Sequence, residues 1–446
     1  MRVVHLAAGA GGMYCGSCMH DNRLAATLTG RGRDVVLIPL YTPLRTDETD
    51  VSERRVYYGG INAYLQQFTA LFRRTPWFLD RLFDVPGLLR IVGKLAARTR
   101  PEVLGAMTLS VLRGEHGRQR KELAKLIAGL RSLKPNLVYV PNLMFVGVAS
   151  RLKAELGVPV LCGLTGEDIF LDGLPDPHRA EAFELIRERA GDVNGFVALT
   201  RYYARHTTRH FALPPDRVHQ ITMGIRTEDF AEAAAPPDEP FTIGYLARIC
   251  PEKGLAGLCD AFVDLRRAGR SCRLRIAGYL GKADQPYFDR IAKRIKQAGL
   301  DDAFEYVGEV SRAEKLGFLQ SLHVLSVPTV YAEAKGFYVL EALAAGVPVV
   351  LPKHGAFPEL VEGTGGGVLH EPGSRSALAE ALAGLMDNPG RRRDLASAGR
   401  SAVRESFTAE RMANDAWQLF EQFVQPTLAT RGGAAGGRLR RGRFTT

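Results

Sequence analysis

The residues with the clearest chemical potential lie in the segment IGYLARICPEKGL, residues 243–255. An apolar strand pattern there is followed by Arg248 and then by Lys253, just ahead of a helical pattern. Two cations at the end of a strand and beside a helix N-terminus suit a diphosphate, because the free backbone N–H groups add to their charge. The segment therefore predicts a phosphate-binding site.

A second segment, YAEAKGFYVLEALAAGVPVV at residues 331–350, places two carboxylates near a helix start. Glu333 falls in a loop, Gly336 and Phe337 open a helix, and Glu341 lies in its first turns. A helix whose N-terminus begins at a glycine offers free backbone N–H groups to a phosphate. A nearby glutamate can hold hydroxyl groups of a sugar or a ribose.

A third segment, GAGGMYCGSCMHDN at residues 9–22, has three interpretations. Its glycines could cradle a phosphate, Cys15 and Cys18 could be redox-active, or these two and His20 could hold a metal. A dinucleotide fingerprint requires a third glycine where Tyr14 stands. A zinc site usually has four ligands, and no second pair with matching spacing occurs. Packing or loop geometry is therefore the favoured role of the cysteines.

The elements that must position these residues alternate between apolar strands and helical repeats. A fold with helices on both faces of parallel sheets is typical of this alternation. A Pro- and Ala-rich linker, AEAAAPPDEP at 231–240, divides the strands into two series. The sequence predicts an α/β protein of two doubly wound domains that face each other across a cleft, with the site at the carboxyl ends of the strands. The expected strands are 35–40, 137–140, 158–164, 196–199 and 218–222, then 241–246, 273–277, 304–307, 324–327 and 347–351.

The predicted boundaries follow from these patterns. An N-terminal domain covers 1–232, with an aromatic and basic helical insertion at about 45–130, and a second domain covers 240–410. A helix is expected at 411–428, and the Gly- and Arg-rich tail 430–446 is expected to be disordered.

Composition limits the class of protein. The 446 residues carry a net charge of +11, of which five positive charges lie in the tail. No apolar run is long enough to span a membrane, and no signal peptide is recognised, so we expect a cytoplasmic protein. The six cysteines do not form a disulfide framework. No nucleic-acid-binding motif occurs, whereas the insertion suits a peripheral contact with the inner face of a membrane.

Together the segments at 243–255 and 331–350 resemble the family 4 retaining glycosyltransferases, which have the GT-B fold. By this resemblance Arg248 and Lys253 bind the donor diphosphate. Glu333 and Glu341 match the family's pair of glutamates and would contact the donor sugar and the nucleoside ribose. The looser similarity of the first half extends over nearly the whole chain apart from 45–130 and the tail.

The resemblance also implies the remaining site residues. Thr165 stands where the family often has a histidine close to the donor sugar, which puts sugar selectivity in question. The catalytic residues implied are Arg248, Lys253 and Glu333; the donor-binding residues are Gly11, Gly12, Gly336, Phe337, Glu341, Gly355 and Glu359; and His20, Asp21, Thr165 and Asp168 lie on the acceptor or sugar side.

The implied activity is transfer of a hexose from a UDP- or GDP-type nucleotide sugar to a hydroxyl of a glycan or a lipid-linked acceptor, with retention of configuration. Neither a metal nor another cofactor is expected, because the cations and the helix N-terminus would stabilise the leaving diphosphate. The cysteines would then be neighbours of the site, neither a redox pair nor a zinc site. Two alternatives stay open: a nucleotide-sugar epimerase of the same fold, and a non-catalytic protein that binds a membrane or nucleic acid.

Overall fold

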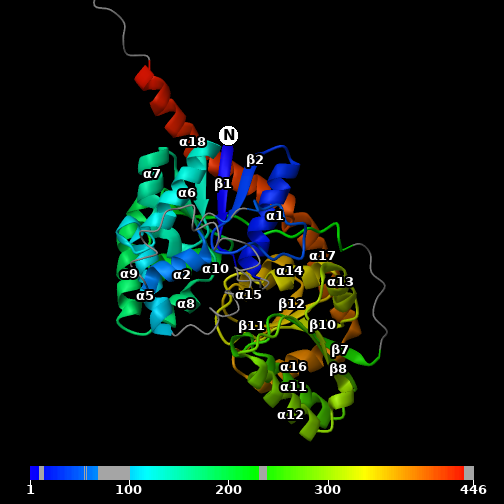
Figure 1. The fold of residues 1–446 in the computed structure, drawn as a ribbon. Coiled ribbons are helices and arrows are strands. Elements are labelled where there is room, and N and C mark those ends of the chain that lie inside the picture. Colours follow the sequence, from blue (N-terminus) through cyan, green and yellow to red (C-terminus); the bar gives the residue numbers. More distant parts are fainter. Residues whose placement is uncertain (10–14, 55, 57, 69–100, 231–238, 436–446) are drawn as a thin grey trace, which may run out of the picture.

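The computed structural model describes the chain except for residues 10–14, 55, 57, 69–100, 231–238 and 436–446. The described part contains two six-stranded sheets in which all recorded strand pairs are parallel. Figure 1 shows that each sheet is the centre of its own domain, with helices on both faces. The two doubly wound domains predicted from the sequence are confirmed.

The first sheet has the strand order β2-β1-β3-β4-β5-β6. The neighbours of β1 in the sheet are β2 on one side and β3 on the other, so the carboxyl end of β1 lies at a switch point, where doubly wound proteins bind ligands. The strands are β1 (Arg2–Ala7), β2 (Asp34–Pro39), β3 (Leu137–Val140), β4 (Val160–Leu164), β5 (Gly195–Ala198) and β6 (Val218–Gln220). The α-helices are α1 (Gly16–Gly30), α2 (Gly60–Phe68), α5 (Pro101–Leu112), α6 (Arg120–Leu133), α7 (Ala149–Leu156), α8 (Asp168–Asp172), α9 (His178–Arg189) and α10 (Arg201–His210).

The second sheet has the order β12-β11-β10-β7-β8-β9, and its switch point lies between β7 and β10. The strands are β7 (Phe241–Leu246), β8 (Cys272–Ala277), β9 (Phe304–Gly308), β10 (Val324–Ser326), β11 (Val349–Pro352) and β12 (Gly367–His370). The α-helices are α11 (Leu255–Arg267), α12 (Gln285–Gln297), α13 (Arg312–Gln320), α14 (Phe337–Ala344), α15 (Phe357–Thr364), α16 (Arg375–Met386), α17 (Pro389–Ser406) and α18 (Ala409–Ala435). A 3-10 helix, η5 (Pro251–Lys253), precedes α11.

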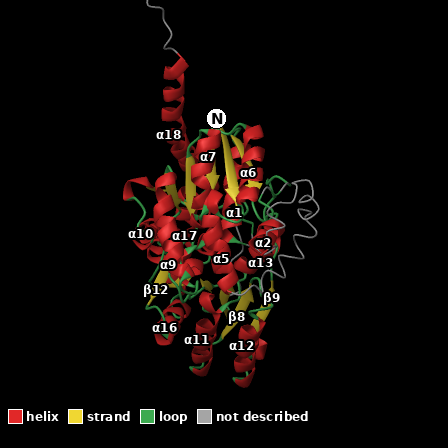
Figure 2. Cartoon of the chain, turned by 60° about the vertical axis from the view of Figure 1, so that its left-hand side comes forward, coloured by secondary structure: helices red, strands yellow, loops and turns green. Residues whose placement is uncertain are grey.

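Helix α18 crosses back from the second domain to the first, where it packs on α1 and β3 (Figures 1 and 2). Its buried face includes Met412, Phe420 and Val424. The Phe420 ring lies 6.0 Å from that of Tyr139 in β3. The helix begins two residues before the expected position and continues to Ala435, into the segment that we expected to be a tail.

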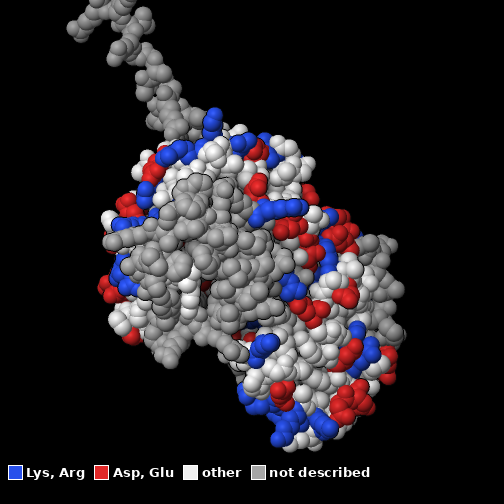
Figure 3. All heavy atoms as spheres, in the orientation of Figure 1, with Lys and Arg blue, Asp and Glu red and all other residues white. Residues whose placement is uncertain are grey.

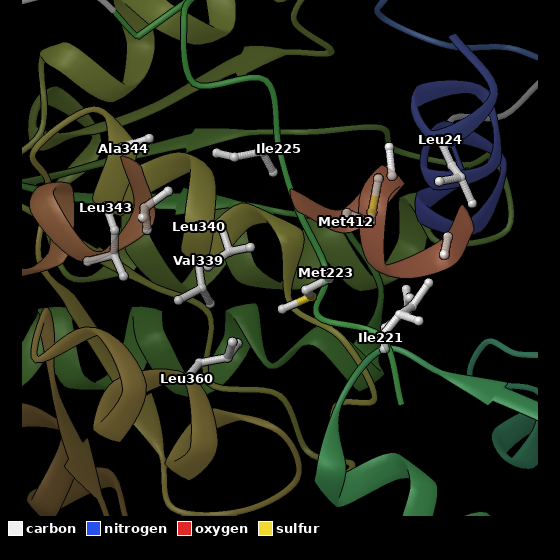
Figure 4. Packing of buried hydrophobic residues seen from close by; sticks show 14 of the residues in the cluster. Leu24, Ile221, Met223, Ile225, Val339, Leu340, Leu343, Ala344, Leu360 and Met412 are labelled. Atoms are coloured by element: carbon white, nitrogen blue, oxygen red, sulfur yellow. The ribbon is translucent and has the colours of Figure 1, made fainter. Parts of the chain in front are cut away.

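A continuous hydrophobic cluster joins the two domains. It combines Leu24 of α1 and the segment after β6 with residues of α14, α15 and α18. Figure 4 shows Met223 and Ile225 of that segment on the side of Leu340 of α14, and Ile221 on the side of Met412 of α18. The position of α14, at the edge of the interface, is therefore set by apolar packing from both domains.

Charge is spread over the described face of the molecule shown in Figure 3, where both signs alternate. Positive side chains gather toward the end of the second domain that carries α11 and α12. Among the described residues, no helix has both the length and the apolar character that crossing a membrane requires.

Candidate active site

The loops that follow β7 and β10 meet at the switch point of the second sheet. The Lys253 Nζ atom donates a hydrogen bond to Glu333 Oε2 at 2.5 Å. The backbones are joined nearby, because Val330 N donates to the carbonyl of Glu252 at 2.9 Å. Two residues that lie eighty positions apart in the sequence, and that were predicted to act on one donor, are therefore in direct contact.

Glu333 is buried, and its carboxylate is held by three donors. The hydroxyls of Tyr331 and Tyr338 donate to Oε2 at 3.2 and 3.1 Å, beside the Lys253 ammonium. Burial alone would raise the pKa of Glu333, but Lys253 outweighs it, with help from Lys335 and Tyr338, and the pKa lies below the usual range. Glu333 is thus a fixed carboxylate at neutral pH.

Helix α14 begins directly after this carboxylate. Its N-cap, Gly336, has the left-handed conformation with φ 91°, and no side chain caps the first turn, which starts at Phe337. Gly355 approaches the same loop so closely that a Cβ atom there would lie 2.5 Å from Glu333 N. The uncapped N–H groups of α14 carry partial positive charge and are suited to an anion.

Arg248 follows β7 and is exposed. Its Nε atom donates to Cys250 Sγ at 3.3 Å. Burial, and then the Glu333 carboxylate, raise the pKa of Tyr331, whereas the charge of Arg248 opposes this rise. Arg248 therefore lies near the Glu333 cluster, although no direct bond between the two is recorded in the described part of the chain.

Lys335 is a cation that the sequence analysis did not select. Its Nζ atom donates to Ser17 Oγ at 2.7 Å and to the carbonyl of Thr165 at 2.6 Å. Ser17 lies in the first turn of α1, and Thr165 directly follows β4, so Lys335 joins the start of α1 and the loop after β4 to the loop of Glu333. A basic residue between Glu333 and Gly336 was a visible signal, but its partners were not.

Glu341 takes part in a buried ion-pair cluster between the domains. The Lys315 ammonium donates to Glu341 Oε1 and to Asp47 Oδ2, each at 2.6 Å. Burial would lower the pKa of Lys315, but both carboxylates raise it above its ordinary value. The Arg312 guanidinium lies 3.3 Å from Glu48, which also binds Arg23 at 2.7 Å. The predicted ribose contact, Glu341, is therefore linked through Lys315 to the first domain.

Glu359 caps a helix of the other domain. Its two carboxylate oxygens accept from Arg201 N and Tyr202 N, both at 2.9 Å, at the start of α10. Thr200, the N-cap of α10, donates from its hydroxyl to the carbonyl of Ala334 at 3.0 Å. In this arrangement Glu359 acts between the domains, and its predicted contact with the donor stays a prediction.

His20 and Asp21 lie in the second turn of α1 and are buried. The His20 ring stacks on Phe337 at 5.9 Å, so His20 reaches the start of α14. Burial lowers the pKa of His20 to about 3, and its imidazole is neutral. Asp21 points elsewhere, with Oδ1 3.0 Å from Nε2 of His5.

Asp168 accepts from the Tyr203 hydroxyl at 2.7 Å and contacts His206 at 3.1 Å, and within the described residues it forms no hydrogen bond or ion pair with Lys253, Glu333 or Lys335. Glu167, which the sequence analysis passed over, holds the loop after β4. Its buried carboxylate accepts from Thr165 N at 2.7 Å and from Leu143 N at 3.1 Å. Thr165 is the member of this loop that meets Lys335.

The predicted donor contacts Gly11 and Gly12 lie outside the described residues. Where the structure describes the chain, no three His, Cys, Asp or Glu side chains converge as a set of metal ligands. The arrangement can therefore be summarised by its charges: two lysines and a helix N-terminus surround one fixed carboxylate, and loops from both domains complete the site.

Two doubly wound domains whose strand-end loops meet around such a site define the GT-B arrangement of glycosyltransferases. The fold agrees with that of sucrose-phosphate synthase from Thermosynechococcus elongatus, with a TM-score of 0.68, 16% identity and coverage of 96% of this chain and 100% of that one. The structure of Anabaena Alr3699/HepE in complex with UDP gives a TM-score of 0.66 at 16% identity, over 95% of this chain and 100% of that one.

Sequence comparison specifies the family. Residues 226–402 match the family described as glycosyl transferases group 1. A putative colanic acid biosynthesis glycosyltransferase, WcaL of Salmonella typhimurium, is 31% identical over 325 residues, which are 70% of this chain and 77% of that protein. The chain belongs to this family of group 1, or family 4, glycosyltransferases with the GT-B fold.

Coverage of other relatives is shorter. The phosphatidyl-myo-inositol mannosyltransferase of Mycobacterium leprae is 29% identical over 225 residues, which span 50% of this chain and 56% of that protein. None of these comparisons favours an epimerase or a non-catalytic binding protein.

Proposed function

We propose that this glycosyltransferase moves a hexose from a nucleotide-sugar donor to an acceptor hydroxyl with retention of anomeric configuration and without a metal ion. The observation that carries the proposal is the contact of Lys253 with Glu333 at 2.5 Å, beside the uncapped N-terminus of α14. This is a place where charge is available for a diphosphate and a carboxylate is available for sugar hydroxyls.

The diphosphate would lie between Arg248, Lys253 and the N–H groups that start α14. Breaking the bond from the sugar to the diphosphate develops negative charge on the leaving oxygens. Fixed positive charges and oriented N–H groups stabilise that charge without reorganising during the reaction. Arg248 is exposed, and among the described residues it forms no ion pair with a carboxylate. Its guanidinium is therefore available to the diphosphate.

The sugar would lie against Glu333, whose carboxylate already accepts from three donors and is kept ionised by Lys253. Glu341 would meet the ribose through Oε2, since Lys315 occupies Oε1. His20 and Phe337, which stack on each other, would line the sugar from the side of the first domain. The leaving phosphate itself would help to deprotonate the acceptor hydroxyl, so no separate protein base is assigned.

The donor is a UDP- or GDP-type sugar, and the acceptor is a glycan or a lipid-linked sugar. Support comes from the complex of HepE with UDP, and from the mycobacterial relative, which is named for phosphatidyl-myo-inositol. We place the activity in the cytoplasm, with peripheral contact to the inner face of the membrane through the aromatic and basic insertion. The described part of that insertion includes α2, α5 and α6.

The test is release of nucleoside diphosphate from a panel of UDP-, GDP- and ADP-sugars, with and without a chelator. Glu333→Gln removes the charge at nearly constant shape, and Glu362→Gln, an exposed glutamate of α15, is the matched control. We expect release from one donor, no effect of the chelator, loss in Glu333→Gln and no change in Glu362→Gln. The anomeric coupling constant of the product checks retention. Binding of no nucleotide sugar by calorimetry would contradict the proposal.

A further inference from the structure

Cys15 and Cys18, at the start of α1, have a geometry that the proposed transfer reaction does not use. Cys15 is the N-cap of α1, with an extended backbone at φ −123° and ψ 124°, and no side chain caps the first turn. Its carbonyl accepts from Met19 N at 2.9 Å. Cys18 lies three residues on, in the same turn. Both side chains belong to one small cluster with Ala7, Leu37 and neighbouring residues.

The two thiols pack in the same small cluster but differ in access. Cys15 is half-buried, whereas Cys18 and the other four cysteines of the chain, all of which are described, are buried. Side chains three residues apart on a helical turn lie within reach of a disulfide after a small adjustment. The Cys15 thiol is therefore partly accessible to solvent, whereas the neighbouring Cys18 thiol is buried.

The surroundings shift the pKa values of the two thiols in opposite directions. The hydrogen bond from Cys18 lowers the pKa of Cys15 to about 5, against the effect of burial and with help from the charge of Lys335. The same bond, followed by burial and the charges of Cys15 and Asp21, raises the pKa of Cys18 far above its usual value. A low pKa on the accessible thiol and a high one on the buried thiol are the requirements of an attacking and a resolving cysteine.

In place of the sequence-based expectation that these cysteines are not a redox pair, we propose that Cys15 and Cys18 form a reversible disulfide, and that this thiol modification site controls the contact between the two domains. With a low-molecular-weight disulfide such as oxidised glutathione, the Cys15 thiolate attacks one sulfur and releases one glutathione. The Cys18 thiol then loses its proton, attacks the Cys15 sulfur and releases the second glutathione. Two electrons pass from the protein to glutathione disulfide, which is reduced to two thiols.

The link to the active site runs through Ser17, which lies between the two cysteines. Its hydroxyl accepts the bond from Lys335 at 2.7 Å, and Lys335 stands two residues after Glu333. A disulfide requires the first turn of α1 to move, and the position of Ser17 must change with it. The oxidised protein is therefore expected to lose the Lys335–Ser17 contact and to transfer sugar more slowly.

The chemical test uses the full-length protein in glutathione redox buffers, followed by mass spectrometry of the peptide that contains both cysteines. We expect an internal Cys15–Cys18 disulfide and the loss of two free thiols. Cys18→Ser should gain one glutathione on Cys15, and Cys15→Ser should gain none. In the Cys18→Ala variant the hydrogen bond that activates Cys15 is gone, and alkylation at pH 6 should slow relative to the wild type. If the oxidised wild type contains no Cys15–Cys18 disulfide, the proposal is wrong.

The pH dependence of the alkylation rate tests whether Cys15 is the attacking thiol. Between pH 8 and pH 6 the rate at Cys15 should stay nearly constant, while that of an ordinary cysteine falls by about two orders of magnitude. A rate at Cys15 that falls like that of an ordinary cysteine would overturn its assignment as the attacking thiol.

The functional test compares donor turnover in the reduced and oxidised forms. The wild type should lose activity on oxidation and regain it with dithiothreitol, whereas Cys15→Ser/Cys18→Ser should be insensitive to oxidant. Equal sensitivity of the double variant would place the effect at another residue and would refute the control of transfer. The reduced enzyme keeps its activity in either case, so failure here is distinct from failure of the proposed function.

Discussion

The two domains bring different chemistry to the interface that they share. Around Glu333, the loops of the second domain carry charge, in the form of Lys253, Glu333 and Lys335. The loops of the first domain that meet them offer neutral groups: the hydroxyl of Ser17 and the carbonyl of Thr165. The second domain is thus equipped to bind a charged donor, whereas the first is equipped to hold the loop that carries its carboxylate.

The largest effect is expected from Lys253→Ala, which tests whether the second domain binds the charged donor. It removes the charge that faces the proposed diphosphate and leaves Glu333 without its ammonium partner. We expect turnover to fall by about a hundredfold or more, the cost of removing one group that stabilises a developing anion. Nucleoside diphosphate release at saturating donor measures it. Lys282→Ala, an exposed lysine of the same domain, should behave as the wild type. Near-normal turnover in Lys253→Ala would disprove the diphosphate assignment.

The next largest effect is expected from Lys315→Met. This variant tests the buried ion pairs of Lys315 with Asp47 and Glu341, through which charged groups of both domains meet. The substitution leaves Asp47 and Glu341 without the ammonium that joins them. Breaking a buried ion pair by removing one partner costs about 3 kcal/mol in the free energy of unfolding. Denaturant unfolding measures the loss. Arg131→Ala, which breaks an exposed pair with Glu155, should cost far less.

The same cluster predicts a pH dependence. Burial would raise the pKa of Asp47, but Lys315 and Arg312 lower it below its ordinary value. A carboxylate whose folded-state pKa is lowered stabilises the fold fully above its unfolded pKa of about 3.9, and the stabilisation is lost as the pH falls through the folded value. The stability difference between wild type and Asp47→Asn should therefore be constant from pH 8 to pH 5 and should shrink in stronger acid. A difference that grows in acid would contradict the direction.

A smaller effect is expected from Glu359→Ala, which removes the cap that the second domain places on α10. Loss of a helix cap costs about 1 kcal/mol. Thr200 remains as the cap within the first domain and limits the loss. Thermal unfolding, with Glu362→Ala on the same helix α15 as control, measures it. If donor affinity falls while stability is unchanged, Glu359 acts on the donor, as the sequence analysis predicted, and not on the other domain.

The smallest effect is expected from the first domain, in a variant of the two cysteines at the start of α1. Under reducing conditions, Cys15→Ser/Cys18→Ser should leave transfer largely intact, because neither thiol contacts Lys253 or Glu333 in the described structure. Turnover measured with dithiothreitol present checks this. A loss of activity together with a loss of bound zinc would instead restore the metal interpretation of this segment.

Much of the fold could be predicted because strands buried on both faces produce continuous apolar runs. The predicted segments at 137–140 and 241–246 coincide with β3 and β7. Strand β12 was missed because it begins at Gly367, in a glycine-rich stretch of low strand propensity. The expected linker falls mostly on residues that the structure does not describe.

Less of the site could be predicted, for a physical reason. Glu333 and Lys253 were recognisable because each lies next to a strand end and a helix start. Lys335, Lys315 and Asp47 were not, because a charged residue in a sequence does not show which distant group it will meet. Lys315 and Asp47 are 268 residues apart in the chain. The contacts between the domains could come only from the folded structure.

The return of α18 to the first domain has a consequence for synthesis on the ribosome. The apolar surface that Met412, Phe420 and Val424 cover belongs to a domain whose own strands are complete at β6. About 200 residues separate β6 from the end of that contact, so at ribosomal elongation rates the nascent first domain waits about 10 to 40 s for its last helix. During this interval the surface around β3 and α1 is open to a chaperone, and native packing is completed only when α18 emerges.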